Sequence, residues 1–329
     1  MKSNESLWGR PARLAAVVGA ALLVACGGGQ QVETFRANRV LAFGDETSVI
    51  SADGSKYSVN ALQSADNTKL DCSSNPLWIQ NVAAVYGLVF PECNLLPVVA
   101  PVSRIYASAG ARVAGIGPQI DLHIASGGFT EQDMVTMLAG ANDILDQYAQ
   151  YPGVSEVQLT INVEQAGAEL AAQVNRIANL GAKVLLATTL DMGYTPFALT
   201  EEVANAGRAA LLSRLSERFN AKLRANIMND GRKIGLIKLD EYVKSVAKAR
   251  LVGVGIFINT TLVACLPTSP LPTCTTKTLG TDAATVPPPA TPTAADGITW
   301  LWADATHLSA GGQVSLGSLA VTRALNNPF

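Results

Sequence analysis

Five short runs of apolar residues are spaced along this chain and predict the strands of a sheet. They cover residues 40–43, 104–108, 134–138, 182–190 and 234–239. The first run has four apolar residues in succession, and the fourth is the longest. Runs without polar alternation are typical of parallel strands that are covered on both faces. We therefore expect a parallel sheet that lies between two layers of helices.

Helical periodicity fills the intervals between these runs. Residues 163–180 and 201–228 repeat apolar side chains every three or four positions, which predicts amphipathic helices. Ser309 is a suitable N-cap for a last helix that runs to about residue 325. Alternating strands and helices imply right-handed crossovers and a three-layer α/β/α sandwich. The apolar positions of the two segments are Leu170, Val174 and Ile177, then Leu211, Leu215, Phe219 and Leu223.

Two long segments, 54–101 and 253–299, show neither periodicity. Loops of this length in a compact domain are usually functional or mobile, so both are candidates to shape a substrate pocket. Surface decoration without a function is the alternative, and the sequence does not separate the two. No break in composition divides residues 39–329, and a chain of this length can bury a large core. We expect one domain.

Residues 1–25 predict an export signal. A basic start is followed by an apolar stretch at 14–24, which is too short to span a bilayer, where about 20 residues are needed. The Leu-Val-Ala-Cys sequence that ends at Cys26 resembles a bacterial lipobox, so we expect lipidation of Cys26 and a flexible tether over 26–38. Gly27 directly follows the cysteine, and in this the segment resembles lipoproteins of the outer membrane. An ordinary secretory signal is the alternative.

Four further cysteines agree with export, because an even number in an oxidising compartment predicts disulfides. Three connectivities are open to them. We favour the local pairs Cys72 with Cys93 and Cys265 with Cys274, each of which closes a short loop. A metal site is the competing use of these residues. No Cys-x-x-Cys occurs and neither histidine is close to a cysteine in sequence, so we expect no metal and no cofactor.

The charge of the chain excludes one class of partner. Its formal net charge is −2, and no cluster of basic residues stands out. Binding to nucleic acid is therefore not predicted. We expect a monomer that reaches the membrane through its N-terminal lipid.

Three motifs lie where a doubly wound fold places its chemistry, in loops beyond the carboxyl ends of the strands. Gly-Asp-Glu-Thr-Ser at 44–48 follows the first strand, Gly-Ala-Asn-Asp at 140–143 follows the third, and Asp304 and His307 precede the last helix. Together these motifs resemble the SGNH/GDSL hydrolases. The resemblance implies a flavodoxin-like sheet of five parallel strands in the order 2-1-3-4-5. It also implies hydrolysis of carboxylic esters that carry acyl or acetyl groups.

The resemblance assigns roles to single residues. In that family a serine attacks the carbonyl carbon, a histidine accepts its proton and an aspartate orients the histidine. It implies that His307 is the base and that Asp304 orients it. The backbone N–H of Gly110, the side chain of Asn142 and the backbone N–H at position 46 would stabilise the oxyanion.

Each of these roles has a structural alternative. His307 would then be a surface loop histidine, and 140–143 a plain turn and helix cap, where Asn and Asp are preferred. The other histidine, His123, lies in an apparent helix at 119–125 and is a poorer candidate for the base.

Glu46 stands at the position of the nucleophilic serine. Attack of a carboxylate on an ester gives an acid anhydride, which is a poorer intermediate than an acyl-serine. Glu46 could instead be a general base toward water, a nucleophile toward an sp3 carbon, or the partner of His307 in an ion pair. Ser48, two residues further on, is a rival nucleophile, and Thr47 is a weaker one.

Two classes of function follow. The first is an envelope-anchored hydrolase of acyl or acetyl esters, in which Ser48 or a water activated by Glu46 completes the site. The second is a protein without catalytic activity that binds a lipid, an ester or a glycan at the cell envelope. A purely structural lipoprotein is a third and weaker interpretation. Retention of the donor and base positions favours the first class, and loss of the serine favours the second.

Overall fold

The computed structural model describes residues 35–95, 97–98, 100–251, 255–284 and 291–329. The predicted signal peptide, the predicted lipidation site Cys26 and most of the predicted tether lie outside the described residues. Residues 35–329 form one compact unit. None of the described helices is long and apolar enough to cross a membrane.

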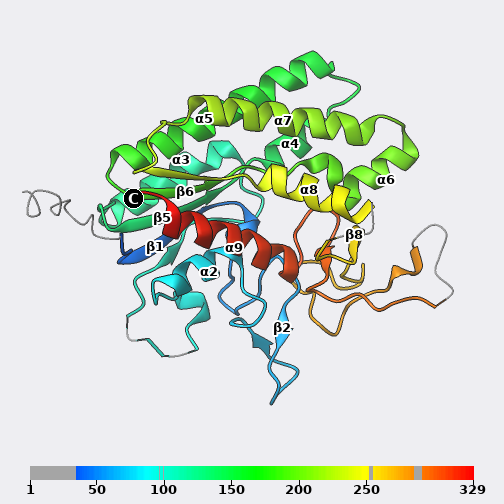
Figure 1. The fold of residues 1–329 in the computed structure, drawn as a ribbon, viewed down its shortest axis with the longest axis horizontal. Helices are drawn as coiled ribbons and strands as arrows, with labels where there is room; N and C mark the ends of the chain where they lie inside the picture. The colour runs from blue at the N-terminus through cyan, green and yellow to red at the C-terminus, as the bar shows by residue number, and fades with distance from the viewer. Residues whose placement is uncertain (1–34, 96, 99, 252–254, 285–290) are drawn as a thin grey trace, which may run out of the picture. The chain divides into compact units, whose positions relative to one another are not determined.

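A sheet of five parallel strands forms the middle of this unit (Figure 1). Its strands lie in the order β4-β1-β5-β6-β7, which is 2-1-3-4-5 when only these five are numbered along the chain, as predicted. Gly44 and Leu138 pair at the carboxyl ends of neighbouring strands, so the loops after them start side by side. The strands are β1 (Arg39–Gly44), β4 (Arg104–Ile105), β5 (Asp133–Leu138), β6 (Lys183–Ala187) and β7 (Ile234–Ile237).

Helices cover both faces of the sheet and complete the predicted α/β/α sandwich (Figure 1). One layer consists of α2 (Trp78–Val85) and α9 (Ala310–Asn326), which pack against each other. The other layer contains α3 (Val113–Ala125), α5 (Glu156–Asn179) and α7 (Arg208–Asn226). The apolar run at 40–43 is completely buried between the layers, which explains why it lacks polar alternation.

The helix predicted over 201–228 is wrong in its extent, because two helices occupy this region. These are α6 (Pro196–Ala204) and α7, and Gly207 separates them with a φ of +89°. The left-handed backbone of Gly207 cannot continue a right-handed helix. The Glu202 carboxylate caps the start of α7 by accepting hydrogen bonds from the Gly207 and Ala209 N–H groups.

Two other helix ends follow their caps. The helix predicted from residue 163 begins earlier, at Glu156, because the Ser155 hydroxyl caps it by accepting from Gln158 N–H. The Ser309 N-cap of α9 is confirmed, since its hydroxyl accepts a hydrogen bond from Gly312 N–H. Three predicted strands are shorter than expected, at Arg104–Ile105, Lys183–Ala187 and Ile234–Ile237.

The segment 54–101 is not an irregular loop throughout. It contains α2, which belongs to a main helix layer, and a small antiparallel pair of β2 (Ala61–Leu62) and β3 (Leu70–Asp71). Lys56 is fully buried, and its ammonium group donates three hydrogen bonds of 2.8 to 3.0 Å to backbone carbonyls. This lysine holds the chain that leads to α2, with the carbonyls of Cys72, Ser74 and Asn75 as acceptors.

The segment 253–299 also contains regular structure. Its β8 (Asn259–Val263) pairs in parallel with β9 (Trp300–Trp302), just before the loop of His307. Both predicted disulfides are confirmed, since Cys72 is bonded to Cys93 and Cys265 to Cys274. They brace the two segments that the sequence left without assigned structure.

A further helix, α8 (Leu239–Leu251), follows β7.

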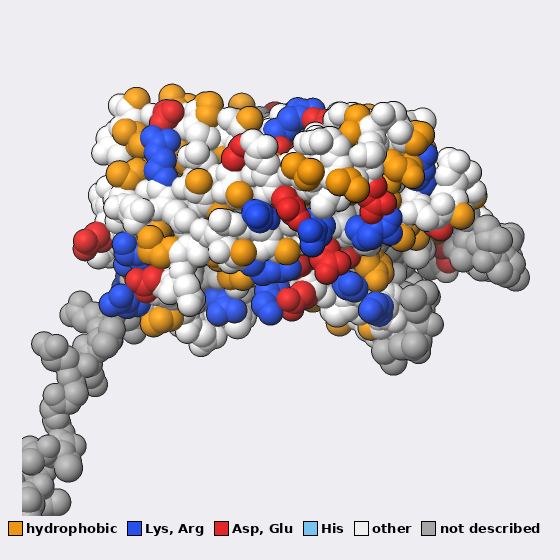
Figure 2. All heavy atoms as spheres, turned by 90° about the horizontal axis from the view of Figure 1, so that it is seen from above, with side chains coloured by type: hydrophobic (Ala, Val, Ile, Leu, Met, Phe, Trp, Pro, Cys, Tyr) orange, Lys and Arg blue, Asp and Glu red, His pale blue; other side chains and the backbone are white. Residues whose placement is uncertain are grey.

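The face in Figure 2 carries basic and acidic side chains that are intermixed with scattered apolar ones. Two ion pairs join α7 to α5, from Arg214 to Glu156 at 2.6 Å and from Arg218 to Glu164 at 2.7 Å. Side chains of opposite sign therefore neutralise each other locally on these helices.

Candidate active site

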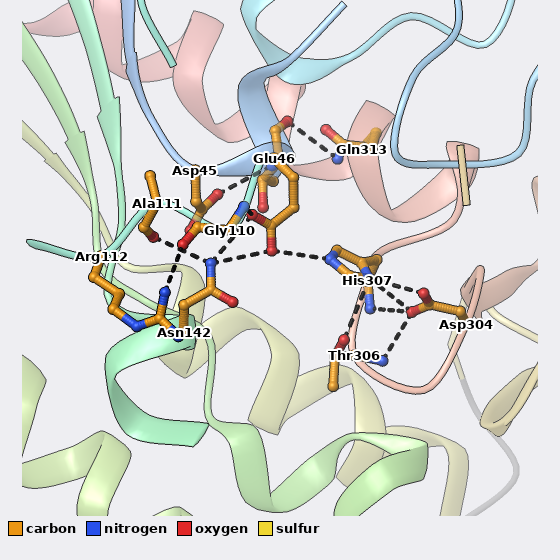
Figure 3. Close-up of polar contacts among 11 residues, drawn as sticks. Asp45, Glu46, Gly110, Ala111, Arg112, Asn142, Asp304, Thr306, His307 and Gln313 are labelled. Carbon is orange, nitrogen blue, oxygen red and sulfur yellow. Dashed lines mark hydrogen bonds and ion pairs between the residues drawn. The ribbon is translucent and has the colours of Figure 1, made fainter. Parts of the chain in front are cut away.

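The predicted site residues lie together beyond the carboxyl edge of the sheet (Figure 3). Glu46 begins a short 3-10 helix, η1 (Glu46–Ser48), directly after β1, and Gly110 follows β4. Asn142 is the second residue of α4 (Ala141–Tyr148), which follows β5. His307 lies in the loop between β9 and α9. Three chain segments that are distant in sequence from Glu46 thus converge on its carboxylate.

The backbone around Gly44 directs Glu46 into this space. Gly44 has a φ of +130°, and a Cβ atom there would lie 1.9 Å from the carbonyl oxygen of Leu138. Only glycine allows the chain to turn so close to the neighbouring strand. Asp45 N–H donates to the same carbonyl at 3.1 Å, and the Asp45 carboxylate caps η1 by accepting from Thr47 N–H.

The Glu46 carboxylate accepts hydrogen bonds on both oxygens. Gly110 N–H donates to Oε2 at 2.7 Å, and Asn142 Nδ2 lies 3.1 Å from Oε2 and 3.2 Å from Oε1. His307 Nε2 lies 3.1 Å from Oε1. The donors predicted for an oxyanion therefore already hold the carboxylate of the protein itself.

His307 lies between two carboxylates. Its Nδ1 is 2.8 Å and 2.9 Å from the two Asp304 oxygens, and its Nε2 faces Glu46. An ionised carboxylate can only accept hydrogen bonds, so each ring nitrogen must carry a proton. The ring is therefore an imidazolium. Asp304 also accepts from the backbone N–H groups of Thr306 and His307, which fixes its orientation.

The electrostatics agree with this protonation state. Burial lowers the pKa of His307, but the hydrogen bonds and charges of Asp304 and Glu46 outweigh it and raise the pKa to about 10. Burial raises the pKa of Glu46, but the hydrogen bonds from His307 and from Gly110 N–H hold it below its usual value. Burial and the nearby Glu46 charge raise the pKa of Asp45 to about 7.

We expect the imidazole of His307 to stay protonated across the neutral range. Its pKa in the folded chain, about 10, is above the ordinary value of about 6.5. The charged ring therefore stabilises the fold fully below about pH 6.5, and this contribution is lost as the pH rises toward about 10. NMR titration can follow it, because the chain has only two histidines.

His123 is the internal control in that titration, because burial lowers its pKa. Glu46→Gln should lower the pKa of His307, since one of its two carboxylate partners is lost. A His307 resonance that titrates near pH 6.5 in the wild-type protein would contradict the ion-pair geometry.

Residues 102–314 match a sequence profile described as GDSL-like Lipase/Acylhydrolase. The match covers about two thirds of the chain and includes Gly110, Asn142, Asp304 and His307. The chain belongs to this acylhydrolase family. The match begins after β1 and so does not include the Glu46 loop.

Two solved structures resemble this chain at low sequence identity. A putative GDSL-like lipase from Parabacteroides merdae is 11% identical over 89% of this chain and 98% of its own, with a TM-score of 0.43. The acetylxylan esterase Axe2 from Geobacillus stearothermophilus is 12% identical over 89% and 96%, also with a TM-score of 0.43. No curated protein matches the sequence.

Ser48 does not lie where a nucleophile of this site would lie. Its side chain is fully buried, and its hydroxyl accepts a hydrogen bond from Trp78 Nε1 at 3.0 Å. Among the described contacts, none joins it to His307. The prediction of Ser48 as a rival nucleophile is therefore corrected, because η1 turns its side chain into the core. His123 does not contact Glu46 in the described contacts; its Nδ1 lies 2.9 Å from the Tyr106 hydroxyl.

Two residues that position the site, Gln119 and Asp143, were not predicted, because no sequence motif assigns them this role. Gln119 on α3 bonds both the N–H and the carbonyl of Gly44, each at 2.9 Å, and so holds the turn before Glu46. Asp143 accepts from Val113 N–H and ties α3 to α4 beside Asn142. Both are single polar residues that only the fold brings to the site. No group of three or more metal-ligating side chains occurs among the described residues.

Proposed function

We propose that this protein is an exported hydrolase of the acylhydrolase family that cleaves carboxylic esters of acyl or acetyl groups, with Glu46 in place of the nucleophilic serine. One observation carries the proposal. The Glu46 carboxylate lies within hydrogen-bonding distance of both oxyanion donors, Gly110 and Asn142, and of His307. Family membership supports ester hydrolysis as the reaction.

On an ester, Glu46 would act as a general base toward water. His307 cannot accept a proton while both ring nitrogens already carry one, whereas the Glu46 carboxylate is ionised and can accept a proton. The ester carbonyl would enter the space beside Gly110 and Asn142 and displace Oε2. A positioned base typically accelerates such a step roughly 100-fold to 10,000-fold.

The ester reaction is tested with p-nitrophenyl acetate. We expect slow hydrolysis by the wild-type protein and a loss of roughly 100-fold in Glu46→Gln, because the amide cannot accept the proton of water. A fluorophosphonate probe should not label the wild-type protein, since Glu46 stands at the nucleophile position and the nearby Ser48 hydroxyl is buried against Trp78. Glu201→Gln is the matched control, because it alters a carboxylate that bonds Tyr148 away from the site. Unchanged hydrolysis in Glu46→Gln would refute the role of Glu46.

Binding without hydrolysis is the second candidate function, and a specific contact favours it. Both donors are already engaged by Glu46, so an ester carbonyl can use them only by displacing a charged group. In that case the wild-type protein binds a lipid, ester or glycan at the envelope and hydrolyses none of them. Wild type and Glu46→Gln would then be equally inactive in the ester assay.

The proposed location is the outer membrane, through a lipid on Cys26. Cys26→Ser removes the thiol that would carry the lipid and should release the protein from the membrane fraction of a bacterial host. Fractionation followed by immunoblotting measures this. Cys72→Ser serves as a control that alters another cysteine without touching the signal sequence. Unchanged membrane partitioning of Cys26→Ser would contradict the anchor.

A further inference from the structure

The carboxyl group of Glu46 occupies the place in which an oxyanion-stabilising site holds the carbonyl of an acyl group. Oε2 accepts from two donors, Gly110 N–H and Asn142 Nδ2, as an oxyanion would. Oε1 faces His307 Nε2 at 3.1 Å. The donors are therefore arranged around a carboxyl group of the protein itself. If Glu46 became an ester, Oε2 would be its carbonyl oxygen and would already lie against these donors.

From this geometry we propose that Glu46 is a nucleophile toward an sp3 carbon that carries a halide, so that the protein hydrolyses alkyl halides through a glutamyl ester. The inference rests on the proposed function only in taking the site to be hydrolytic. A carboxylate that attacks an sp3 carbon forms an ordinary ester, whereas attack on a carbonyl would form an anhydride.

In the first step a lone pair of Oε1 forms a bond to the sp3 carbon while the carbon–halogen bond breaks. The halide leaves with the bonding pair, and Glu46 becomes a neutral alkyl ester whose carbonyl oxygen is Oε2. Gly110 N–H bonds only Oε2, at 2.7 Å, and so holds Oε2 as the later carbonyl oxygen, whereas the contacts of Oε1 to Asn142 and His307 are longer, at 3.2 Å and 3.1 Å. A halide needs no proton as it leaves. This matters because both protons of the His307 ring already point at carboxylates.

In the second step water attacks the Cδ atom of the glutamyl ester. Neutral His307 accepts a proton from that water, and the carbonyl electron pair moves to Oε2, where Gly110 N–H and Asn142 stabilise the negative charge. The intermediate then collapses, the bond from Cδ to the alkyl oxygen breaks, and the alcohol leaves with the proton from His307. The sum is alkyl halide plus water to alcohol, halide and a proton.

His307 changes its role between the two steps for an electrostatic reason. In the resting site two anionic partners hold its proton. Alkylation neutralises Glu46, so one of the two charges is lost and the ring can release a proton to solvent. The side chain of His307 is 21% exposed, which gives that proton a path. Asp304 stays in place to orient the neutral ring for the attack of water.

The size of the substrate follows from burial. The Glu46 side chain is only 10% exposed, so the carbon that is attacked must belong to a small or unbranched group. We therefore choose 1-bromobutane as the probe, with bromide release as the readout.

The decisive experiment is a single turnover in oxygen-18 water with protein in excess over 1-bromobutane. If Glu46 is the nucleophile, the first butanol contains ordinary oxygen from Oε1, and the peptide that contains Glu46 gains oxygen-18. Direct attack of water would instead put oxygen-18 into butanol, and that outcome would overturn the proposal. Bromide release that survives Glu46→Gln would overturn it as well.

His307→Gln gives a second measurement. The first step should still release bromide, but hydrolysis of the ester should slow by roughly 100-fold to 10,000-fold, so butyl-Glu46 accumulates and is seen by mass spectrometry. Glu201→Gln should behave as wild type. Absence of bromide release from folded wild-type protein would refute the inference. If p-nitrophenyl acetate is still hydrolysed, the proposed ester activity stands alone, and if neither substrate reacts, both proposals fail.

Discussion

Replacing Glu46 by serine is expected to convert this protein into a serine esterase. The change frees Gly110 N–H and Asn142 for the oxyanion, removes a carboxylate that keeps His307 protonated, and supplies a hydroxyl nucleophile. We expect hydrolysis of p-nitrophenyl acetate at least about 100-fold faster than in wild type, which is the lower range for assisted proton transfer. Kinetic assays and fluorophosphonate labelling at position 46 measure the effect.

Glu46→Ala is the matched control for this gain. It frees the same donors and removes the same charge, but it adds no nucleophile. It should therefore neither react with the probe nor match the rate of Glu46→Ser. Ser48→Ala added to Glu46→Ser should leave labelling unchanged, because the Ser48 hydroxyl bonds Trp78. Equal rates for the alanine and serine variants would mean that Gly110, Asn142 and His307 do not activate a serine at position 46.

Gly44→Ala should be the most damaging small substitution in the site. Its backbone has a φ of +130°, and the added Cβ would lie 1.9 Å from the Leu138 carbonyl oxygen, so two neighbouring strands must separate. Strain at such a φ costs about 1 to 3 kcal/mol, and the backbone clash adds to it. We expect a loss above about 4 kcal/mol in the free energy of unfolding, a large part of what a domain has.

Gly127→Ala isolates the clash from the strain. Gly127 has a similar φ of +126°, but nothing lies within 4 Å of its added Cβ. It should lose only the strain energy of about 1 to 3 kcal/mol. Urea denaturation of both variants gives the comparison. Equal losses at the two positions would show that the contact with Leu138 is not what requires glycine at position 44.

The strands were predictable because their signal is local. Residues 40–43 and 134–138 are apolar in succession, and burial on both faces requires that pattern. The break at Gly207 and the helix α2 were not predicted, since the first lies inside a helical pattern of apolar residues and the second is short and depends on a distant partner. Glu202 caps the new start after Gly207, and α2 is a helix of eight residues that packs on α9.

The sequence by itself determined the sheet and the residue types of the site, whereas it only favoured the disulfide pairs that the structure shows. The motifs at 44–48, 140–143 and 304–307 indicated the family by resemblance, and their places after the strands agree with a parallel sheet, whose strand ends share one edge. The tertiary structure decided what Glu46 and Ser48 do. Their roles depend on which way each side chain points after the turn at Gly44, and that direction is set by the Leu138 carbonyl, Gln119 and Trp78, which are distant in sequence.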